Sequence, residues 1–249
     1  MTRSFPSKLT SRFKKIFGLK ELDLHQIFTE ENSTFFGDNS ATKQHVEFLL
    51  DKRFIESREF TYRDAPENVA NWVRQTNIDW RIHIVTWAAS KCMQIDGDFV
   101  ECGVWWGWLS RAICYYTDFQ NAAKRFHFYD SWGEEGSHEN YQVDIFDKVK
   151  YRFKNYPNVL FHRGMVPDVL WQSSLPDKIA YLSLDMNGGL AERQALDILY
   201  PKVASGGVIY VDDYGWNYPR LRSELADFLK DKPEELLHFP CGSSIIIKA

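Results

Sequence analysis

Short apolar runs that alternate with helical patterns constrain the fold of this chain more than any other feature of its sequence. The runs that we interpret as strands are residues 99–102, 126–129, 159–162, 179–184 and 207–211. Helical periodicity marks residues 79–93, 109–117, 145–154 and 190–199. Alternation of this kind predicts βαβ units, and therefore a parallel sheet whose strands are buried.

The C-terminal end departs from this alternation. A helix is expected at residues 221–230, and two apolar runs follow at 236–239 and 244–248. Pro240, Cys241 and Gly242 lie between these runs and are typical of a turn. We therefore expect a terminal hairpin that closes a mainly parallel sheet, with ligands bound at the carboxyl ends of the strands.

The N-terminal part of the chain is polar and poorly periodic. We divide the chain into a helical or irregular cap or lid at residues 1–76 and a larger domain at 77–249. One helix is expected at 43–55, and residues 58–67 have the composition of a loop. Basic residues alternate with apolar ones between Arg3 and Lys20, which indicates either a solvated helix or a peripheral contact with a membrane or a partner.

The composition excludes several classes of protein. The net charge of −4 gives no electrostatic basis for binding nucleic acid. No apolar run is long enough to span a membrane, and the N-terminus lacks the apolar centre of a signal peptide. The four cysteines include no CxxC pair, which argues against a zinc knuckle and predicts reduced thiols in a cytoplasmic protein.

Two of the expected strands end in residues that suit a nucleotide-like ligand. Glu101 ends the first strand, and Gly103 and Gly107 lie in the turn before the next helix. Glycine lets a backbone approach a ligand closely, Glu101 can hold an ammonium group, and Ser110 either caps the helix or contacts the ligand. Asp130 ends the second strand, where a carboxylate can accept both hydroxyls of a ribose. The alternatives are glycines that serve packing only and an aspartate that is a helix N-cap or a surface loop acid.

Three further carboxylates follow the last two parallel strands. Asp185 follows the run at 179–184, and the pair Asp212 and Asp213 follows the run at 207–211. If these strands are neighbours, the three anions meet at one edge of the sheet, which is costly unless a cation lies between them. Oxygen ligands suit Mg²⁺, Mn²⁺ or Ca²⁺. The alternative is that one member of the pair caps the next turn while the other is solvated.

These motifs together resemble a known family. They read DFVECGV at 98–104, LDMN at 184–187 and LYPKVASGGVIYVDDYG at 199–215. The chain resembles the class I S-adenosylmethionine-dependent methyltransferases and, within them, the macrocin O-methyltransferase family of sugar-modifying enzymes. The resemblance runs from about Trp80 to the C-terminus, includes Arg81, and is most specific in the run that ends in the two aspartates. It implies an α/β fold with a Rossmann-like, seven-stranded, mainly parallel sheet, helices on both faces and a C-terminal antiparallel hairpin.

The resemblance also implies the cofactor S-adenosylmethionine and a set of site residues. The expected cofactor contacts are Glu101, Gly103, Val104, Gly107, Ser110, Asp130, Ser131, Arg163 and Gly164. The expected ligands of Mg²⁺ or another divalent ion are Asp185, Asp212 and Asp213, and the expected catalytic residues are Asp185, Asp213 and Asn187. Relatives commonly have an aspartate, proposed as the general base, where this chain has Asn187, and asparagine cannot take a proton at neutral pH. The base is then Asp213, His162 or a metal-bound hydroxide.

The function that we predict is transfer of a methyl group to a hydroxyl of a sugar, a glycan or a related small molecule. A divalent ion would favour the alkoxide of the acceptor, and the resemblance makes a homodimer an expectation. Rings at Trp105, Trp106, Trp108, Trp132, Tyr214 and Trp216 would stack on ligands, with about half of them serving the core instead.

Two other functions compete with this prediction. A nicotinamide-dependent oxidoreductase or sugar-nucleotide epimerase would carry GxGxxG and a Tyr-x-x-x-Lys pair, which this chain lacks. A non-catalytic module that binds S-adenosylmethionine or a glycan is favoured by Asn187 and by the bulk of Trp105 and Trp106 in the first turn.

Overall fold

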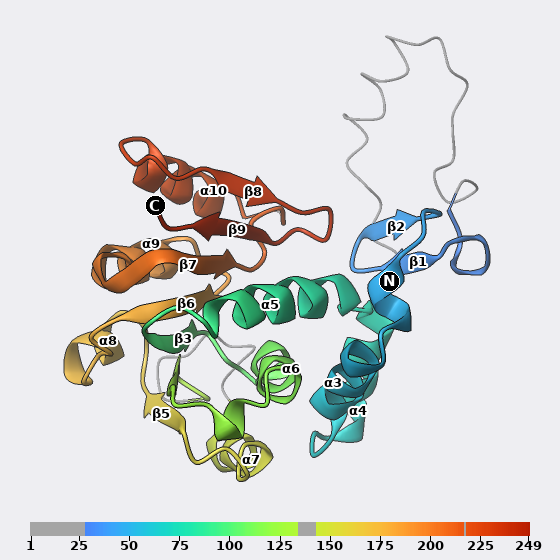
Figure 1. Ribbon diagram of the computed structural model, residues 1–249, viewed down its shortest axis with the longest axis horizontal. Coiled ribbons are helices and arrows are strands. Elements are labelled where there is room, and N and C mark those ends of the chain that lie inside the picture. Colours follow the sequence, from blue (N-terminus) through green and yellow to red (C-terminus); the bar gives the residue numbers. More distant parts are fainter. Residues whose placement is uncertain (1–27, 134–142, 217) are drawn as a thin grey trace, which may run out of the picture.

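One mixed sheet forms the centre of the protein (Figure 1). The computed structural model describes residues 28–133, 143–216 and 218–249. Within them the sheet has the strand order β5-β4-β3-β6-β7-β9-β8. Its strands are β3 (Asp98–Cys102), β4 (Phe126–Asp130), β5 (Val159–Arg163), β6 (Ile179–Leu184), β7 (Val203–Val211), β8 (Leu236–His238) and β9 (Ser244–Ile247). The first five are parallel, and β9 pairs antiparallel with β7 and β8. The predicted seven-stranded sheet with its terminal hairpin is confirmed.

Helices cover both faces of this sheet, as predicted (Figure 1). One face packs against α5 (Asp79–Cys92), α6 (Trp108–Tyr116) and α7 (Phe146–Arg152). The other face packs against α8 (Asp168–Gln172), α9 (Leu190–Leu199) and α10 (Pro219–Leu229). Successive residues of a strand point to opposite faces, so Phe99 enters the first core and Val100 the second. This double burial explains why the strands read as continuous apolar runs.

The prediction for residues 43–67 was wrong. In place of one helix at 43–55, a 3₁₀ turn, η2 (Glu47–Leu50), precedes α3 (Lys52–Tyr62), and α4 (Glu67–Thr76) follows. Asp51 starts α3 because its Oδ1 accepts a hydrogen bond from the Phe54 backbone N–H at 2.7 Å. The expected loop therefore begins as the last turns of α3, where tertiary packing outweighs a weak local pattern.

The helix α3 shares the core of the larger domain. It packs against α6, and Phe54 is buried there with only 1% of its surface exposed. The Arg111 guanidinium on α6 donates to the Phe60 carbonyl at 3.1 Å, and Arg152 on α7 donates to the Thr61 carbonyl at 2.6 Å. The division at residue 76 stays a prediction, but α3 is anchored to the main sheet's helices by apolar and polar contacts.

A small hairpin precedes these helices and was not predicted. It consists of β1 (Phe35–Gly37) and β2 (Ser40–Thr42), joined by a two-residue turn. Both turn residues, Asp38 and Asn39, have left-handed φ angles of 45° and 58°, as a type I′ turn requires. Figure 1 places the hairpin beside the N-terminal end of α5.

The order of the strands decides where a ligand can bind. The chain runs from β3 outward to β5 and then returns to β6 on the other side of β3. The reversal lies between β3 and β6, and the crevice at the carboxyl ends of such strands is the usual ligand site of a doubly wound sheet. Within the described part of the chain, no helix combines the length and hydropathy needed to cross a membrane. The basic residues between Arg3 and Lys20 lie outside the described residues.

Candidate functional site

The turn after β3 joins the two predicted sites. Gly103 has a φ of +84°, and a side-chain carbon there would overlap the backbone carbonyl of Asp185. Gly107 has a φ of +69°, and a side-chain carbon would lie 2.6 Å from the Phe153 ring. Both glycines thus have a packing role, the alternative considered from the sequence. The close approach at Gly103 also sets the expected cofactor turn directly against the first of the three aspartates.

Asp130 organises the same turn. Its Oδ2 accepts hydrogen bonds from the backbone N–H groups of Val104 and Trp105 at 2.6 and 2.7 Å, and its Oδ1 accepts one from Trp132 at 2.7 Å. A carboxylate offers about four acceptor positions, so these bonds leave about one for a ribose. Asp130 therefore fixes the conformation of the turn. To accept hydrogen bonds from both hydroxyls of a ribose, it would have to release at least one of these backbone N–H groups.

Glu101 lies beneath this turn as a buried acid. Its side chain is 2% exposed, and its Oε2 has no hydrogen-bond partner among the described residues. Burial, with smaller contributions from the nearby carboxylates Asp130 and Asp212, raises the pKa of Glu101 to about 8, although the Ser110 side chain acts to lower it. Within the described part of the chain, Ser110 Oγ and Ser183 Oγ are also buried without a hydrogen bond of good geometry. Unpartnered buried polar atoms at the end of β3 suit the polar methionine end of S-adenosylmethionine.

Three aspartates converge at the ends of β6 and β7, as predicted. One carboxylate oxygen from each of Asp185, Asp212 and Asp213 lies within 4.8 Å of the others. Burial and the neighbouring carboxylates raise the pKa of Asp185 and raise the pKa of Asp213 to about 7. A set of three hard oxygen donors that resist ionisation together fits a divalent cation such as Mg²⁺.

Arg81 supplies a positive charge to this cluster, and its partners were missed from the sequence. It is 6% exposed and donates through Nη1 to Asp212 Oδ2 and, at 2.9 Å, to Asp213 Oδ1. The same guanidinium holds Asp38 from the N-terminal hairpin. Asp212 also accepts a hydrogen bond from Tyr210 Oη at 2.5 Å. The one sequence signal was an arginine inside a mostly apolar helix, where burial demands a carboxylate partner.

The other predicted residues lie around this centre at different depths. Arg163 turns toward the start of α7, pairing with Asp144 at 2.9 Å, while the Gly164 backbone N–H donates to the Asp130 carbonyl at 2.9 Å. Ser131 is half-buried beside Asp130. Asn187 is half-buried two residues after Asp185, with a left-handed φ of 60°.

His162 lies apart from the aspartates. It is on β5, with β4 and β3 between it and the strand that carries Asp185. Its ring stacks on Tyr129 with centroids 4.4 Å apart and lies within hydrogen-bond distance, 3.2 Å, of His127. Burial lowers its pKa to about 4. These contacts are those of a packed strand-end histidine.

The aromatic residues near the site divide into core and surface groups. Trp106, Trp108 and Trp132 are buried in the first core, in line with the expectation that about half would serve packing. Trp105 is half-buried and meets Trp72 edge to face, with centroids 6.0 Å apart. Trp216, after the aspartate pair, is 39% exposed.

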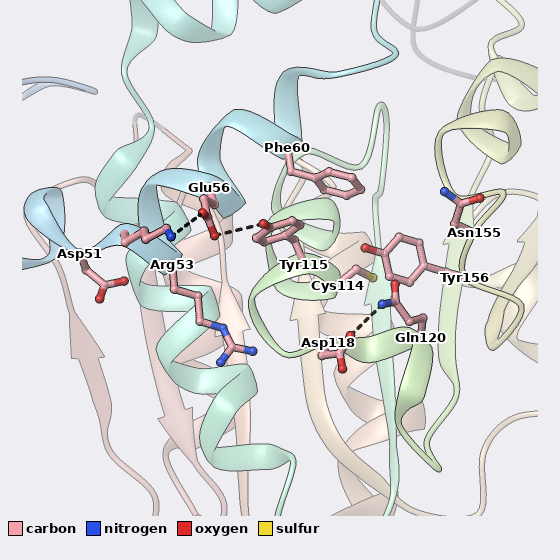
Figure 2. A pocket seen from close by; sticks show the side chains of 11 residues that line it. Asp51, Arg53, Glu56, Phe60, Cys114, Tyr115, Asp118, Gln120, Asn155 and Tyr156 are labelled. Atoms are coloured by element: carbon pink, nitrogen blue, oxygen red, sulfur yellow. Dashed lines mark hydrogen bonds and ion pairs between the residues drawn. The ribbon is translucent and has the colours of Figure 1, made fainter.

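A separate cavity of about 740 Å³ lies between α3 and α6 (Figure 2). Figure 2 shows that its polar side chains engage one another: Tyr115 Oη bonds Glu56 at 3.1 Å, and Gln120 bonds Asp118 at 2.7 Å. Cys114 and Tyr115 are near the C-terminal end of α6, whereas the aspartate cluster adjoins the turn before its N-terminal end. The cavity is therefore distinct from the predicted site.

Comparisons with known proteins identify relatives of this chain and structures with the same fold. A curated relative, demethyldecarbamoylnovobiocin O-methyltransferase from Streptomyces niveus, is 29% identical over 193 residues, which is 63% of this chain and 70% of the relative. The solved structure of the O-methyltransferase NovP matches with a TM-score of 0.56 and 24% identity, over 68% of this chain and 79% of that one. The apo structure of CalS11, a TDP-rhamnose 3'-O-methyltransferase of calicheamicin biosynthesis, matches with a TM-score of 0.54 and 13% identity, over 82% of this chain and 96% of that one.

The fold, the site and these comparisons define the class of protein: the chain is an enzyme, an S-adenosylmethionine-dependent methyltransferase. The family model described as macrocin-O-methyltransferase matches residues 24–235, and the chain belongs to that family. The resemblance recognised in the sequence begins only at about Trp80. The family match begins earlier and therefore also covers the hairpin and α3.

Proposed function

We propose that this enzyme methylates a hydroxyl of a sugar, a glycan or a related small molecule with the help of a divalent cation. The observation that carries the proposal is the contact at Gly103, which sets the cofactor turn against Asp185 and hence beside the aspartate cluster. A methyl donor and a cation that binds the acceptor oxygen have to be neighbours in such a reaction. The activities named for two similar proteins, O-methylation of demethyldecarbamoylnovobiocin and of TDP-rhamnose, support an acceptor of this class.

Each part of the site then has a task. Asp185, Asp212 and Asp213 would hold the cation, and Glu101 with Ser110 would border the methionine end of the cofactor. When bound, the cofactor supplies an activated methyl group and the cation lowers the pKa of the acceptor hydroxyl.

We assign the proton acceptor to Asp213. It is the half-buried member of the aspartate pair, whereas Asp212 is 6% exposed. One oxygen of Asp213 would hold the cation, which leaves its second oxygen to accept the proton of the acceptor hydroxyl. Asn187 cannot accept that proton, and His162 lies on the far side of β3.

The test is calorimetric titration with S-adenosylhomocysteine, with and without Mg²⁺, followed by an acceptor screen. We expect micromolar binding that is lost in an Asp130→Ala variant, and then methylation of glycosides or sugar nucleotides that EDTA abolishes. Turnover that survives EDTA would refute the role of the cation. Absence of cofactor binding in both conditions would refute the proposed reaction.

A second candidate is a non-catalytic relative that retains cofactor binding. It is favoured by Asn187 and by Asp130, whose carboxylate is largely used by the turn's own amides. Cofactor binding with no turnover on any acceptor tested would support it.

A cytoplasmic location is part of the proposal and is supported by the four free, buried cysteines. The homodimer and the membrane contact stay predictions.

A further inference from the structure

The Arg81 guanidinium donates to two groups of carboxylates and, from Nη2 at 3.4 Å, to the Cys241 carbonyl. Along one edge, Nε and Nη2 donate to the two oxygens of Asp38 at 2.6 and 3.2 Å. On the other side, Nη1 alone contacts Asp212 and Asp213. Arg81 and Asp38 are 6% and 4% exposed, so this pairing takes place away from solvent.

The hairpin that carries Asp38 is fixed in place by independent contacts. The Asp38 backbone N–H donates to the Thr76 carbonyl at 2.7 Å, and Asn77 Nδ2 donates to the Phe36 carbonyl at 3.0 Å. The Phe35 ring also packs on the ring of Trp80, one residue before Arg81, with centroids 6.2 Å apart. The position of Asp38 is thus set by the junction of α4 and α5, and not by Arg81 alone.

We propose that Asp38 is a positioning residue for the metal-binding aspartates and that it acts through Arg81. In the metal-free protein, Arg81 is the resident counter-ion of Asp212 and Asp213. When a divalent cation takes its place there, Arg81 keeps its two-bond pairing with Asp38. The inference rests on the metal site of the proposed function, and it makes the N-terminal hairpin part of the active centre.

The physical reason is the cost of a buried charge without a partner. Three aspartates that face each other are destabilised without a cation, and Arg81 relieves this through a single nitrogen. If Asp38 were absent, a cation that displaces this nitrogen would leave the buried guanidinium without a charged partner. With Asp38 present, the guanidinium retains a two-bond carboxylate partner, so the exchange leaves no charge unpaired.

The experiment is a calorimetric titration of the cofactor-free protein with Mn²⁺. Asp38→Asn preserves the shape of the side chain but removes its charge, so Arg81 has only the cluster as a charged partner and competes with the ion. We expect the Kd for Mn²⁺ to rise about tenfold or more. Combining Asp38→Asn with Arg81→Met removes both charges of the pair and should restore binding to within about threefold of the wild type.

The matched control is Asp79→Asn. Asp79 is a buried aspartate on the same helix as Arg81, but it pairs with Arg58 at 2.9 Å. This variant should bind Mn²⁺ like the wild type, and thermal melting without metal checks that all four proteins are folded.

Four results would overturn the inference. Unchanged Mn²⁺ affinity in Asp38→Asn, or an equal loss in Asp79→Asn, would refute the role of Asp38 while leaving the metal site intact. Binding to the double variant but not to the wild type would show that Arg81 occupies the site permanently. Absence of Mn²⁺ binding in every variant would instead refute the metal site of the proposed function, and this inference with it.

Discussion

Replacing Glu101 by glutamine should make the protein's stability less dependent on pH. The change keeps the shape of the side chain and removes a carboxyl group that is 2% exposed and whose Oε2 has no partner among the described residues. In the folded protein, burial raises the pKa of Glu101 from 4.5 to about 8. Between these values the folded state holds a proton that the unfolded state has released. The free energy of unfolding must therefore fall as the pH rises through this window.

The size of the effect follows from the distance between the two pKa values. Each pH unit between them corresponds to about 1.4 kcal/mol for one group. As the pH rises from 4.5 to about 8, the free energy of unfolding of the wild type should fall by up to about 5 kcal/mol relative to that of the glutamine variant. About 3 kcal/mol of this difference should be present at pH 7. Below the pKa of the unfolded state, the free energies of unfolding of the two proteins should differ only by a constant, which is the cost of burying the glutamine amide in place of the protonated carboxyl group.

The assay is urea unfolding of both proteins without cofactor or metal, at pH values from 5 to 8. The measured quantity is the difference between their free energies of unfolding at each pH, because buried acids that Glu101 does not influence, such as Asp79, contribute equally to both proteins. A difference that shifts in favour of the variant as the pH rises supports the argument. A constant difference would show that Glu101 is already ionised in the folded protein at neutral pH, and would refute a buried neutral acid at this position.

Three further predictions concern the packing of the site and of α3. Gly103→Ala should cost more than about 3 kcal/mol, because the new carbon overlaps the Asp185 carbonyl. The control Gly206→Ala has a similar φ of +78°, but its new carbon would only reach ordinary contact with Ile95 Cδ1 at 3.5 Å, so it should cost about 1–2 kcal/mol. Equal costs in urea unfolding would contradict this reasoning. Asp130→Asn should lower the free energy of unfolding by about 1–3 kcal/mol and weaken binding of S-adenosylhomocysteine in calorimetry, because the new side-chain NH₂ group then faces a backbone N–H. Unchanged stability and affinity would refute the role of Asp130 in the turn. Phe54→Ala should lower the free energy of unfolding by about 3–5 kcal/mol in a single transition, because the Phe54 ring is buried in the core. A loss below about 1 kcal/mol would show that α3 is separable from the main domain.

The C-terminal two thirds of the fold followed from local sequence. Strands buried on both faces leave continuous apolar runs, and the helices between them keep a clear period, so their order was sufficient to predict the sheet and its hairpin. The segment 43–76 was predicted poorly because α3 is held by residues of α6 and α7 that lie far away in the chain. The short hairpin at Asp38 gave no comparable pattern.

The sequence alone placed the acidic residues at the ends of the strands, because parallel strands bring their carboxyl ends to one edge. That was sufficient to predict that Asp185, Asp212 and Asp213 would converge. It was not sufficient to show how Asp130 is used or which cation balances the cluster. Those answers depend on Arg81 and Asp38, whose contacts span 131 and 43 residues along the chain. Only the tertiary structure decides such pairings, because a buried charge takes its partner from whatever the packing brings within hydrogen-bond distance.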